Sequence, residues 1–168
     1  GDSLASSALS VTYDGTIPSG YTLDSFSSND HGSGHFAWTG DTVTVSFGGA
    51  EVGASFTWSM ESSGGGTPLS GTGTVSAASD TFDVVIPVGM TDGAVTIRLT
   101  LIDAAGNEGA TVTHAGVLND TQSMTVDNTG PGISSIARLW PSTSPTAGGI
   151  LIWRVTFDER VTDVDKLD

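Results

Sequence analysis

The stretch Val95-Thr96-Ile97-Arg98-Leu99-Thr100-Leu101 decides the fold class. Apolar residues occupy every second position of this segment, and threonine or arginine stands between them. Successive side chains of a β-strand point to opposite faces of the sheet, so this alternation predicts a strand with one buried face and one polar face. We expect that strand to cover residues 94–102.

Other segments of the chain carry the same signal. Val43, Val45 and Phe47 alternate with polar residues, and so do Phe82 and Val84. Clusters of Gly, Ser, Asn and Asp separate these segments, as is typical of turns, and no window shows helical periodicity. The expected strands cover residues 21–27, 42–48, 54–60, 70–76, 81–87 and 94–102, with a last strand split over 110–115 and 121–126.

About seven short alternating strands separated by turns predict an all-β protein, an immunoglobulin-like β-sandwich with Greek-key connections. The chain departs from antibody domains in having no cysteine pair, and Trp58 is expected to fill the core. Gly71-x-Gly73 is expected to mark a bulge or a close approach of two backbones. A phosphate-binding loop would need a following helix, which the pattern does not show.

A second signal is a linker motif that occurs twice. Residues 12–18 (Thr-Tyr-Asp-Gly-Thr-Ile-Pro) and 125–131 (Thr-Val-Asp-Asn-Thr-Gly-Pro) share the frame Thr-x-Asp-x-Thr-x-Pro, displaced by 113 positions from Asp14 to Asp127. We call residues 14–18 and 127–131 the first and second linker motifs. A period of this length matches a whole domain, because solenoid repeats recur every 20 to 50 residues or so.

The repeat predicts the domain organisation. Residues 43–47 and 153–157 also correspond, at a compatible spacing. We expect the end of a preceding repeat or a flank over residues 1–13, an immunoglobulin-like sandwich over 14–127, and the N-terminal part of a following repeat over 128–168.

Composition limits the possible partners. The chain has 19 acidic and five basic residues, a net charge of −14, and no cysteine. Nucleic acids and anionic membranes would repel such a chain. No apolar run approaches the roughly 20 residues that span a bilayer, so we expect no membrane insertion of this fragment.

Catalytic patterns are also missing from the sequence. It contains no Gly-x-Ser-x-Gly elbow, no His-Glu-x-x-His helix and no cysteine nucleophile. His31 and His35 lie in a Gly-rich loop without a helix to orient them as zinc ligands. We therefore expect a protein that is not an enzyme.

The segment Leu101-Ile102-Asp103-Ala104-Ala105-Gly106-Asn107-Glu108, followed by the second linker motif, resembles the bacterial immunoglobulin-like repeats of very large secreted or cell-surface proteins. Residues 133–136 and 155–165 are similar to the opening of a related repeat type. The resemblance covers about residues 35–168. It implies an extender domain of an adhesin-type protein, located extracellularly or at the bacterial surface. Its partners would be neighbouring repeats, with calcium stiffening the junctions.

Several acidic residues are expected to lie in the segments that form the two ends of a sandwich of this topology. The start of the first strand and three of the loops lie at one end, and the last strand finishes at the other. Calcium takes about six to eight oxygen ligands and relieves the repulsion between clustered carboxylates. The ligands expected at the first junction are Asp14, Glu51, Asp103 and Asn107, with Glu108 as a further candidate; those at the second are Asp127 and Glu159, joined by Asp30 or Asp92. Alternatively, residues 103–107 form a plain hairpin turn, with Gly106-Asn107 supplying positive φ.

Two other functions stay open. The first is a module that binds carbohydrate or a cell-surface protein, for which Trp38 or Trp140 should be exposed beside a groove while Trp58 and Trp153 pack inside. The second is a strand-exchanging fibre or assembly subunit, in which residues 133–140 and 150–157 complete the sheet of a neighbour.

Overall fold

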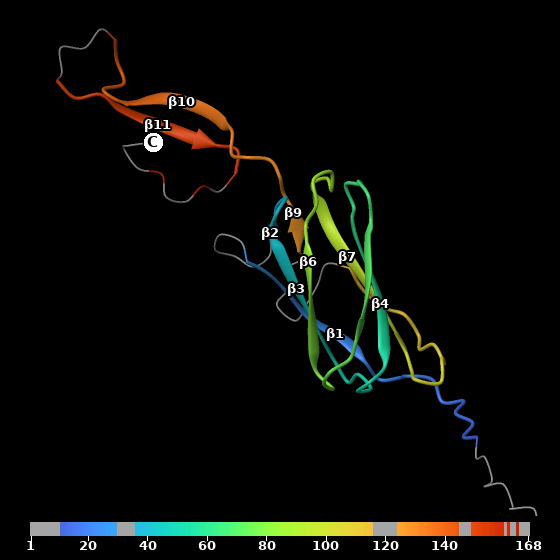
Figure 1. Cartoon of the computed structure of the whole chain (residues 1–168). Helices are drawn as coiled ribbons and strands as arrows, with labels where there is room; N and C mark the ends of the chain where they lie inside the picture. The colour runs from blue at the N-terminus through green and yellow to red at the C-terminus, as the bar shows by residue number, and fades with distance from the viewer. Residues whose placement is uncertain are drawn as a thin grey trace, which may run out of the picture. The chain divides into compact units, whose positions relative to one another are not determined.

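The computed structural model of the chain describes residues 11–29, 36–115, 124–144, 149–159, 161 and 164. These residues are all-β and contain no helix, and hence none long and apolar enough to cross a membrane. The chain divides into two compact units, Gly1–Asn128 and Thr129–Asp168 (Figure 1).

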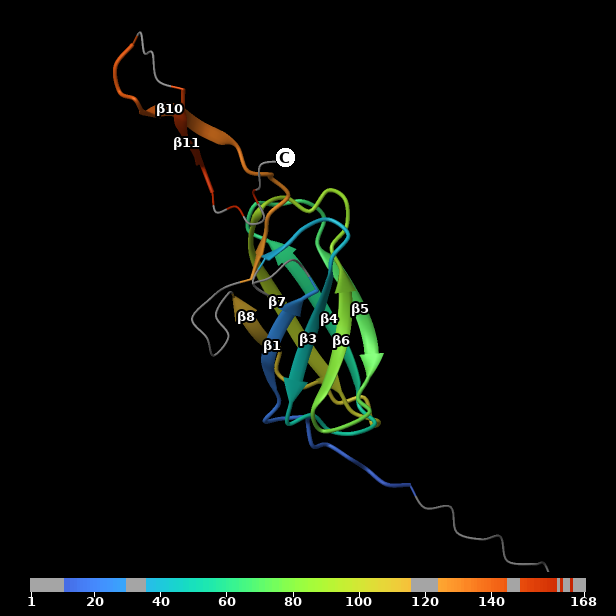
Figure 2. The same cartoon turned by 90° about the vertical axis from the view of Figure 1, so that its left-hand side faces the viewer.

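The first sheet of the first unit has three antiparallel strands in the order β1-β3-β6. They are β1 (Thr22–Ser28), β3 (Thr42–Gly48) and β6 (Asp80–Val85). A β-bulge between Leu23 and Ser25 interrupts the pairing of β1 with β3. Figure 2 shows this sheet in front of the second one.

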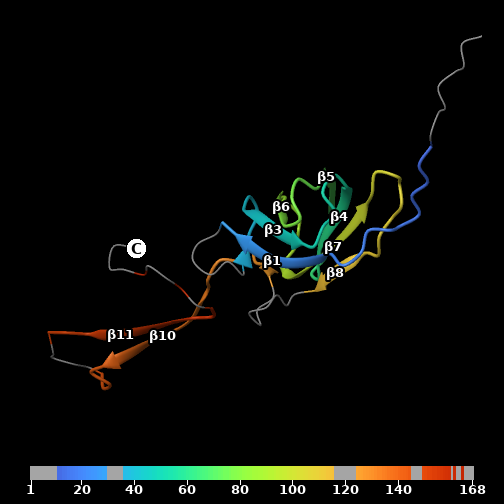
Figure 3. The ribbon, with the colours of Figure 1, turned by 90° about the horizontal axis from the view of Figure 1, so that it is seen from below.

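The second sheet has the strand order β2-β9-β7-β4-β5, and β8 also pairs with β7. Its pairs are antiparallel except for the parallel pair of β2 with β9. Seen from below in Figure 3, the two sheets form two layers. The bounds are β2 (Phe36–Ala37), β4 (Ser55–Ser62), β5 (Leu69–Thr74), β7 (Gly93–Ile102), β8 (Val112–Ala115) and β9 (Thr125–Val126).

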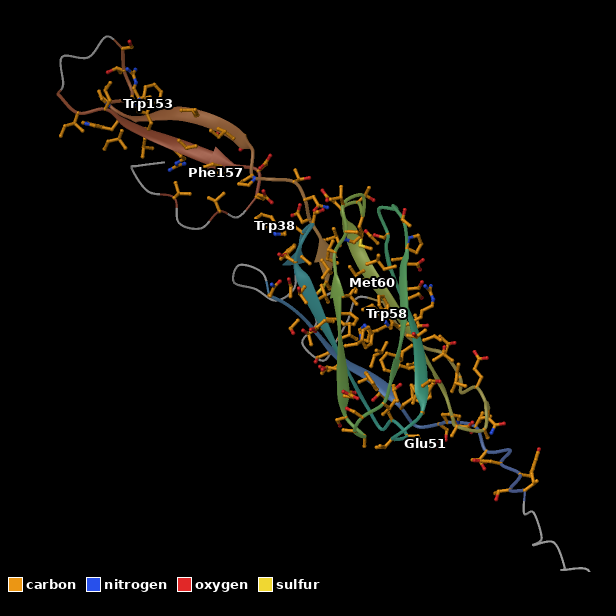
Figure 4. The ribbon with its side chains drawn as sticks, in the orientation of Figure 1. Trp38, Glu51, Trp58, Met60, Trp153 and Phe157 are labelled. Carbon is orange, nitrogen blue, oxygen red and sulfur yellow. The ribbon has the colours of Figure 1, made fainter. Side chains whose placement is uncertain are left out.

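The core lies between these layers, which gives the first unit a β-sandwich-like architecture. Val95, Ile97, Leu99 and Leu101 of β7 are all at most 1% exposed, so the alternation predicted a buried face correctly. On the opposite face, Arg98 forms an ion pair with Glu61 across β4 and β7. Figure 4 shows Trp58 and Met60 of β4 in the region between the sheets.

Two glycines of β5 make room for aromatic rings of β4. A Cβ atom on Gly73 would lie 2.6 Å from Cε1 of Phe56 and closer still to its Cζ, and one on Gly71 would lie 2.7 Å from the indole of Trp58. The expectation of a bulge or a close approach of two backbones at Gly71-x-Gly73 is therefore wrong: β5 pairs regularly with β4, and side chains, not a second backbone, lie against these glycines. Trp58 stacks on Phe82 with ring centroids 5.2 Å apart, which confirms its role in filling the core.

The strands expected from the sequence correspond to β1 and β3–β9, with boundaries shifted by a few residues. The two-residue strand β2 was not expected, because so short a segment shows no alternation. Residues 121–123, expected to begin the second half of the last strand, lie outside the described residues.

The second unit contains the antiparallel pair β10 (Ile133–Trp140) and β11 (Ile152–Phe157). Bulges interrupt it between Ile133 and Ser135 and between Arg138 and Trp140. Figure 4 labels Trp153 and Phe157 on this hairpin. The expectation that Trp153 packs inside is wrong, since its side chain is 54% exposed. Among the described residues of the second unit, only these two strands form, and no second layer covers them.

Candidate functional site

The candidate site comprises the polar loops at the two ends of the first unit. At one end, the loop after β3 meets the loop after β5, where the N–H of Ala50 donates to the carbonyl of Ala78 at 3.0 Å. Glu51 lies at this end and Trp38 at the opposite one (Figure 4). The first linker motif contacts one end, and Asn128 of the second linker motif lies at the other.

Asp103 organises the turn after β7, residues 103–107. Its Oδ1 accepts the N–H groups of Ala105 and Asn107, both at 2.8 Å, and its Oδ2 accepts Nδ2 of Asn107 at 2.8 Å. Gly106 has a φ of 89°, a conformation that favours glycine. The expectation of positive φ is thus confirmed at Gly106. An aspartate that accepts bonds from residues two and four positions later is a typical turn former.

The side chain of Asn107 connects this turn to the first linker motif. Its Nδ2 donates to the carbonyl oxygen of Asp14 at 3.0 Å and lies 3.4 Å from that of Thr16. One amide hydrogen therefore serves Asp103 and the other serves the linker. The Asp14 carboxylate accepts the N–H of Thr16 at 2.9 Å, which shapes the linker locally.

The hydrogen bonds of this turn lower the pKa of Asp103. The largest cause is the bond from the Asn107 side chain, which stabilises the charged carboxylate. Burial acts in the opposite direction, and the N–H groups of Asn107, Ala105 and Gly106 add to the lowering. The carboxylate is therefore held in its charged form as the acceptor of the turn.

Pro18 and Tyr21 attach the end of the first linker motif to the same loop. The hydroxyl of Tyr21 donates to the carbonyl of Ala110 and accepts the N–H of Leu101. Pro18 is buried, and a Cβ atom on Gly109 would lie 2.6 Å from its carbonyl oxygen. The chain entering β1 is thus in direct contact with the segment that follows β7.

Asn128 has an equivalent role at the other end. Its N–H donates to Oδ1 of Asp92 at 2.7 Å, and its Nδ2 lies 3.1 Å from both that oxygen and the carbonyl of Met90. Its Oδ1 accepts the N–H and the hydroxyl of Thr39 at 2.7 and 2.9 Å. The preceding N–H, that of Asp127, donates to the carbonyl of Ala37. Asn128 therefore joins the loop after β2 to the loop before β7.

An open hollow lies beside Asn128. Trp38, which precedes Thr39, is 48% exposed. In the second unit Trp140 is 61% exposed. The residues lining the hollow are Thr39, Gly89, Met90, Thr91, Asp92 and Asn128.

The structure distributes the expected calcium ligands as follows. Asp14, Asp103 and Asn107 are joined by hydrogen bonds. Glu51 lies at the same end with an exposed side chain, and its carbonyl accepts the N–H of Ala54. Asp127, the last residue but one of the first unit, lies at the opposite end, and Glu159 belongs to the second unit. Asp30, His31 and His35 lie outside the described residues.

The amide nitrogen of Asn107 lies between the Asp103 carboxylate and the linker carbonyls and donates to both. Across the described ranges, no group of three or more Asp, Glu or His side chains is placed to hold a metal ion. Calcium needs about six to eight oxygens. Calcium binding at the unit ends stays a prediction from the sequence.

Sequence reasoning missed the part played by Asn128. The available signal was its position inside the second linker motif, because an asparagine side chain can donate and accept at once. Its partners Thr39 and Met90 are distant in the sequence, so no local pattern identifies them. Comparison of the chain with protein-family models, characterised proteins and solved structures finds no match.

Proposed function

We propose that the chain is a structural, non-enzymatic segment of a large bacterial surface or secreted adhesin-like protein. In this proposal β-sandwich units follow one another and act as spacers. The first unit is an immunoglobulin-like sandwich, and β10 and β11 begin a second one. The partners of each unit are then its neighbours along the same chain.

The strand order of the first unit supports the immunoglobulin-like assignment. In that fold the first, second and fifth strands share one sheet, and the third, sixth and seventh share the other. With β8 and β9 taken as one split strand and the two-residue β2 left out of the count, β1, β3 and β6 are the first, second and fifth strands. The third, sixth and seventh are then β4, β7 and β8–β9. The fourth strand, β5, pairs with β4, as in domains that extend the sheet of the third strand.

The observation that carries the proposal is that β10–β11 repeats the register of β1–β3. Leu23 pairs with Phe47, and Ile133 pairs with Phe157, each displaced by 110 positions. A bulge follows Leu23 and a bulge follows Ile133, again 110 positions apart. After the bulge the next four pairs correspond in the same way, ending at Ser28 with Val43 and at Arg138 with Trp153.

The exposure of the hairpin also supports the proposal. Val45 of β3 is fully buried against the second sheet, whereas its counterpart Val155 is 45% exposed. Ile136, the counterpart of the partly buried Phe26, is 59% exposed. An isolated two-stranded hairpin is at best marginally stable in water. The apolar face of β10–β11 therefore fits a covering sheet of the kind that β4 and β7 form over β1–β3 in the first unit.

A tandem duplication tests the proposal on the intact chain. A second copy of residues 19–131 is inserted after Pro131, so that Pro131 precedes Ser19 as Pro18 does. If the first unit is an autonomous repeat, the calorimetric unfolding enthalpy should rise by about 80 kcal/mol, at roughly 0.7 kcal/mol per residue near 60 °C. An unchanged enthalpy, with the inserted residues unfolded, would contradict the proposal.

A second candidate function is carbohydrate binding, favoured by the exposed side chain of Trp38 and by the hollow lined in part by Thr39, Asp92 and Asn128. Aromatic faces next to hydroxyl, amide and carboxylate groups suit sugar recognition. Isothermal titration with a panel of oligosaccharides tests it. A saturable heat that Trp38→Ala abolishes and Trp140→Ala retains would favour this function; the absence of any heat would count against it.

A further inference from the structure

We propose that the second linker motif is bound from both sides. The preceding unit holds the side chain of Asn128, and the following unit holds the carbonyls of Asp127 and Thr129 through its counterpart of Asn107. The inference rests on the proposed function, because it requires a following unit of the same kind. It adds the contacts that join two successive units.

The first linker motif provides the geometry of the following-unit contact. Asn107 donates to the carbonyl of Asp14 and lies within hydrogen-bonding distance of that of Thr16, at 3.0 and 3.4 Å. Asp103 orients this amide by accepting its other hydrogen at 2.8 Å. The motif recurs 113 positions later, so the corresponding acceptors in the second motif are the carbonyls of Asp127 and Thr129.

The second linker motif provides the geometry of the preceding-unit contact. Asn128 uses its N–H, its amide nitrogen and its amide oxygen to bind Asp92, Met90 and Thr39. The residue at the same position of the first motif is Gly15, which has no side chain. The first motif therefore cannot make this contact through residue 15. The following-unit contact is thus observed at the first motif, and the preceding-unit contact at the second.

The two contacts use different atoms and so can form together. The preceding unit uses the N–H and the side chain of Asn128, whereas the following unit uses carbonyl oxygens on the residues either side of it. Each carbonyl oxygen has two lone pairs and can accept more than one hydrogen bond. Hinges between domains need a few residues that are free to change φ and ψ. Binding of three consecutive linker residues in this way would restrict their φ and ψ, so we expect a junction that bends less than an unbound linker.

The test uses the duplicated chain, residues 1–131 followed by residues 19–168. Because the chain has no cysteine, Thr72→Cys in each copy introduces one spin label per unit, at an exposed position of β5. Pulsed electron–electron resonance then measures the distribution of distances between the labels. The linker that joins the two copies, the inner linker, contains Asn128 of the first copy. The unit that follows this linker contributes Asn107 of the second copy.

We expect a narrow distance distribution in the duplicated chain. Asn128→Ala in the first copy and Asn107→Ala in the second copy should each abolish the narrow distribution. The matched controls are the same substitutions in the other copy, Asn128→Ala in the second and Asn107→Ala in the first. Both controls lie outside the inner linker and should leave the distribution narrow.

Two results would overturn the inference. One is a broad distribution in the parent chain while calorimetry shows both copies folded, which leaves the repeat proposal intact. The other is a distribution that stays narrow in either inner variant. An inserted copy that does not fold would overturn the proposed function and this inference together, and calorimetry on the same samples distinguishes that case.

Discussion

Substitution of Gly73 by alanine tests how the two sheets of the first unit pack. The added methyl group would meet the ring of Phe56, which is 4% exposed and lies 5.3 Å from Phe47 and 5.5 Å from Phe82 between ring centroids. The ring cannot move without displacing these neighbours. Overpacking of this kind costs about 1–3 kcal/mol, and the lower entropy of the unfolded alanine chain offsets about 0.4–1 kcal/mol.

The expected net loss is therefore about 1–2 kcal/mol in the free energy of unfolding. For each kcal/mol lost, the melting temperature of a unit of about this size should fall by roughly 4–8 °C. Urea unfolding measures the loss, with near-ultraviolet circular dichroism reporting on the aromatic cluster. Thr72→Ser, an exposed change between the two glycines, serves as the control and should leave the midpoint unchanged.

A double-mutant cycle identifies the cause of the loss. Phe56→Leu shortens the side chain that occupies the space beside Gly73, so Gly73→Ala should be less destabilising in that background. The coupling energy should be about 0.5–2 kcal/mol, as for residues in contact. An equal loss in both backgrounds, or no loss from Gly73→Ala alone, would refute the packing argument.

Three further results are expected. Tyr21→Phe should lower the free energy of unfolding by about 1–3 kcal/mol in urea titrations, because it leaves the carbonyl of Ala110 and the N–H of Leu101 without this partner. The control Tyr13→Phe changes a ring that is 92% exposed and should have no effect. Hydrogen bonds lower the pKa of Asp103 and Asp80 in the folded state. The stability that these two carboxylates provide is therefore present above their unfolded pKa of about 4 and is lost as the pH falls through their folded pKa values. The urea midpoint should fall in that pH range, and it should fall less in Asp103→Asn. If calcium binds at the first junction as the resemblance implies, it should raise the melting temperature according to RT ln(1 + [L]/Kd), and Glu51→Gln should abolish the rise; a melting temperature unaffected by calcium would contradict that expectation.

Local patterns predicted the strands because the physical signal is itself local. Val95, Ile97 and Leu99 alternate with polar residues whatever the rest of the chain does, and they are buried as expected. The turn at Asp103 and Gly106 is equally local, since an aspartate and a glycine supply its acceptor and its positive φ. These features needed no knowledge of long-range contacts.

Features that depend on distant segments could not be predicted in the same way. Asn128 binds Thr39 and Met90, and nothing in their sequence neighbourhoods links them. Trp153 lies in a strand pattern that indicates burial, but its burial needs a second layer that the hairpin by itself does not have. The strand β2 forms by backbone pairing with β9 over two residues, a length at which no periodicity exists.

Single-molecule force spectroscopy on the duplicated chain tests the spacer function most directly. A unit with the 113-residue period that separates Asp14 from Asp127 should release roughly 370–410 Å of chain, at about 3.3–3.6 Å per residue. The account predicts two separate unfolding events, each with this increment, where the original chain gives one. A single event in the duplicated chain, or two events of clearly unequal length, would contradict a chain built from autonomous units in series.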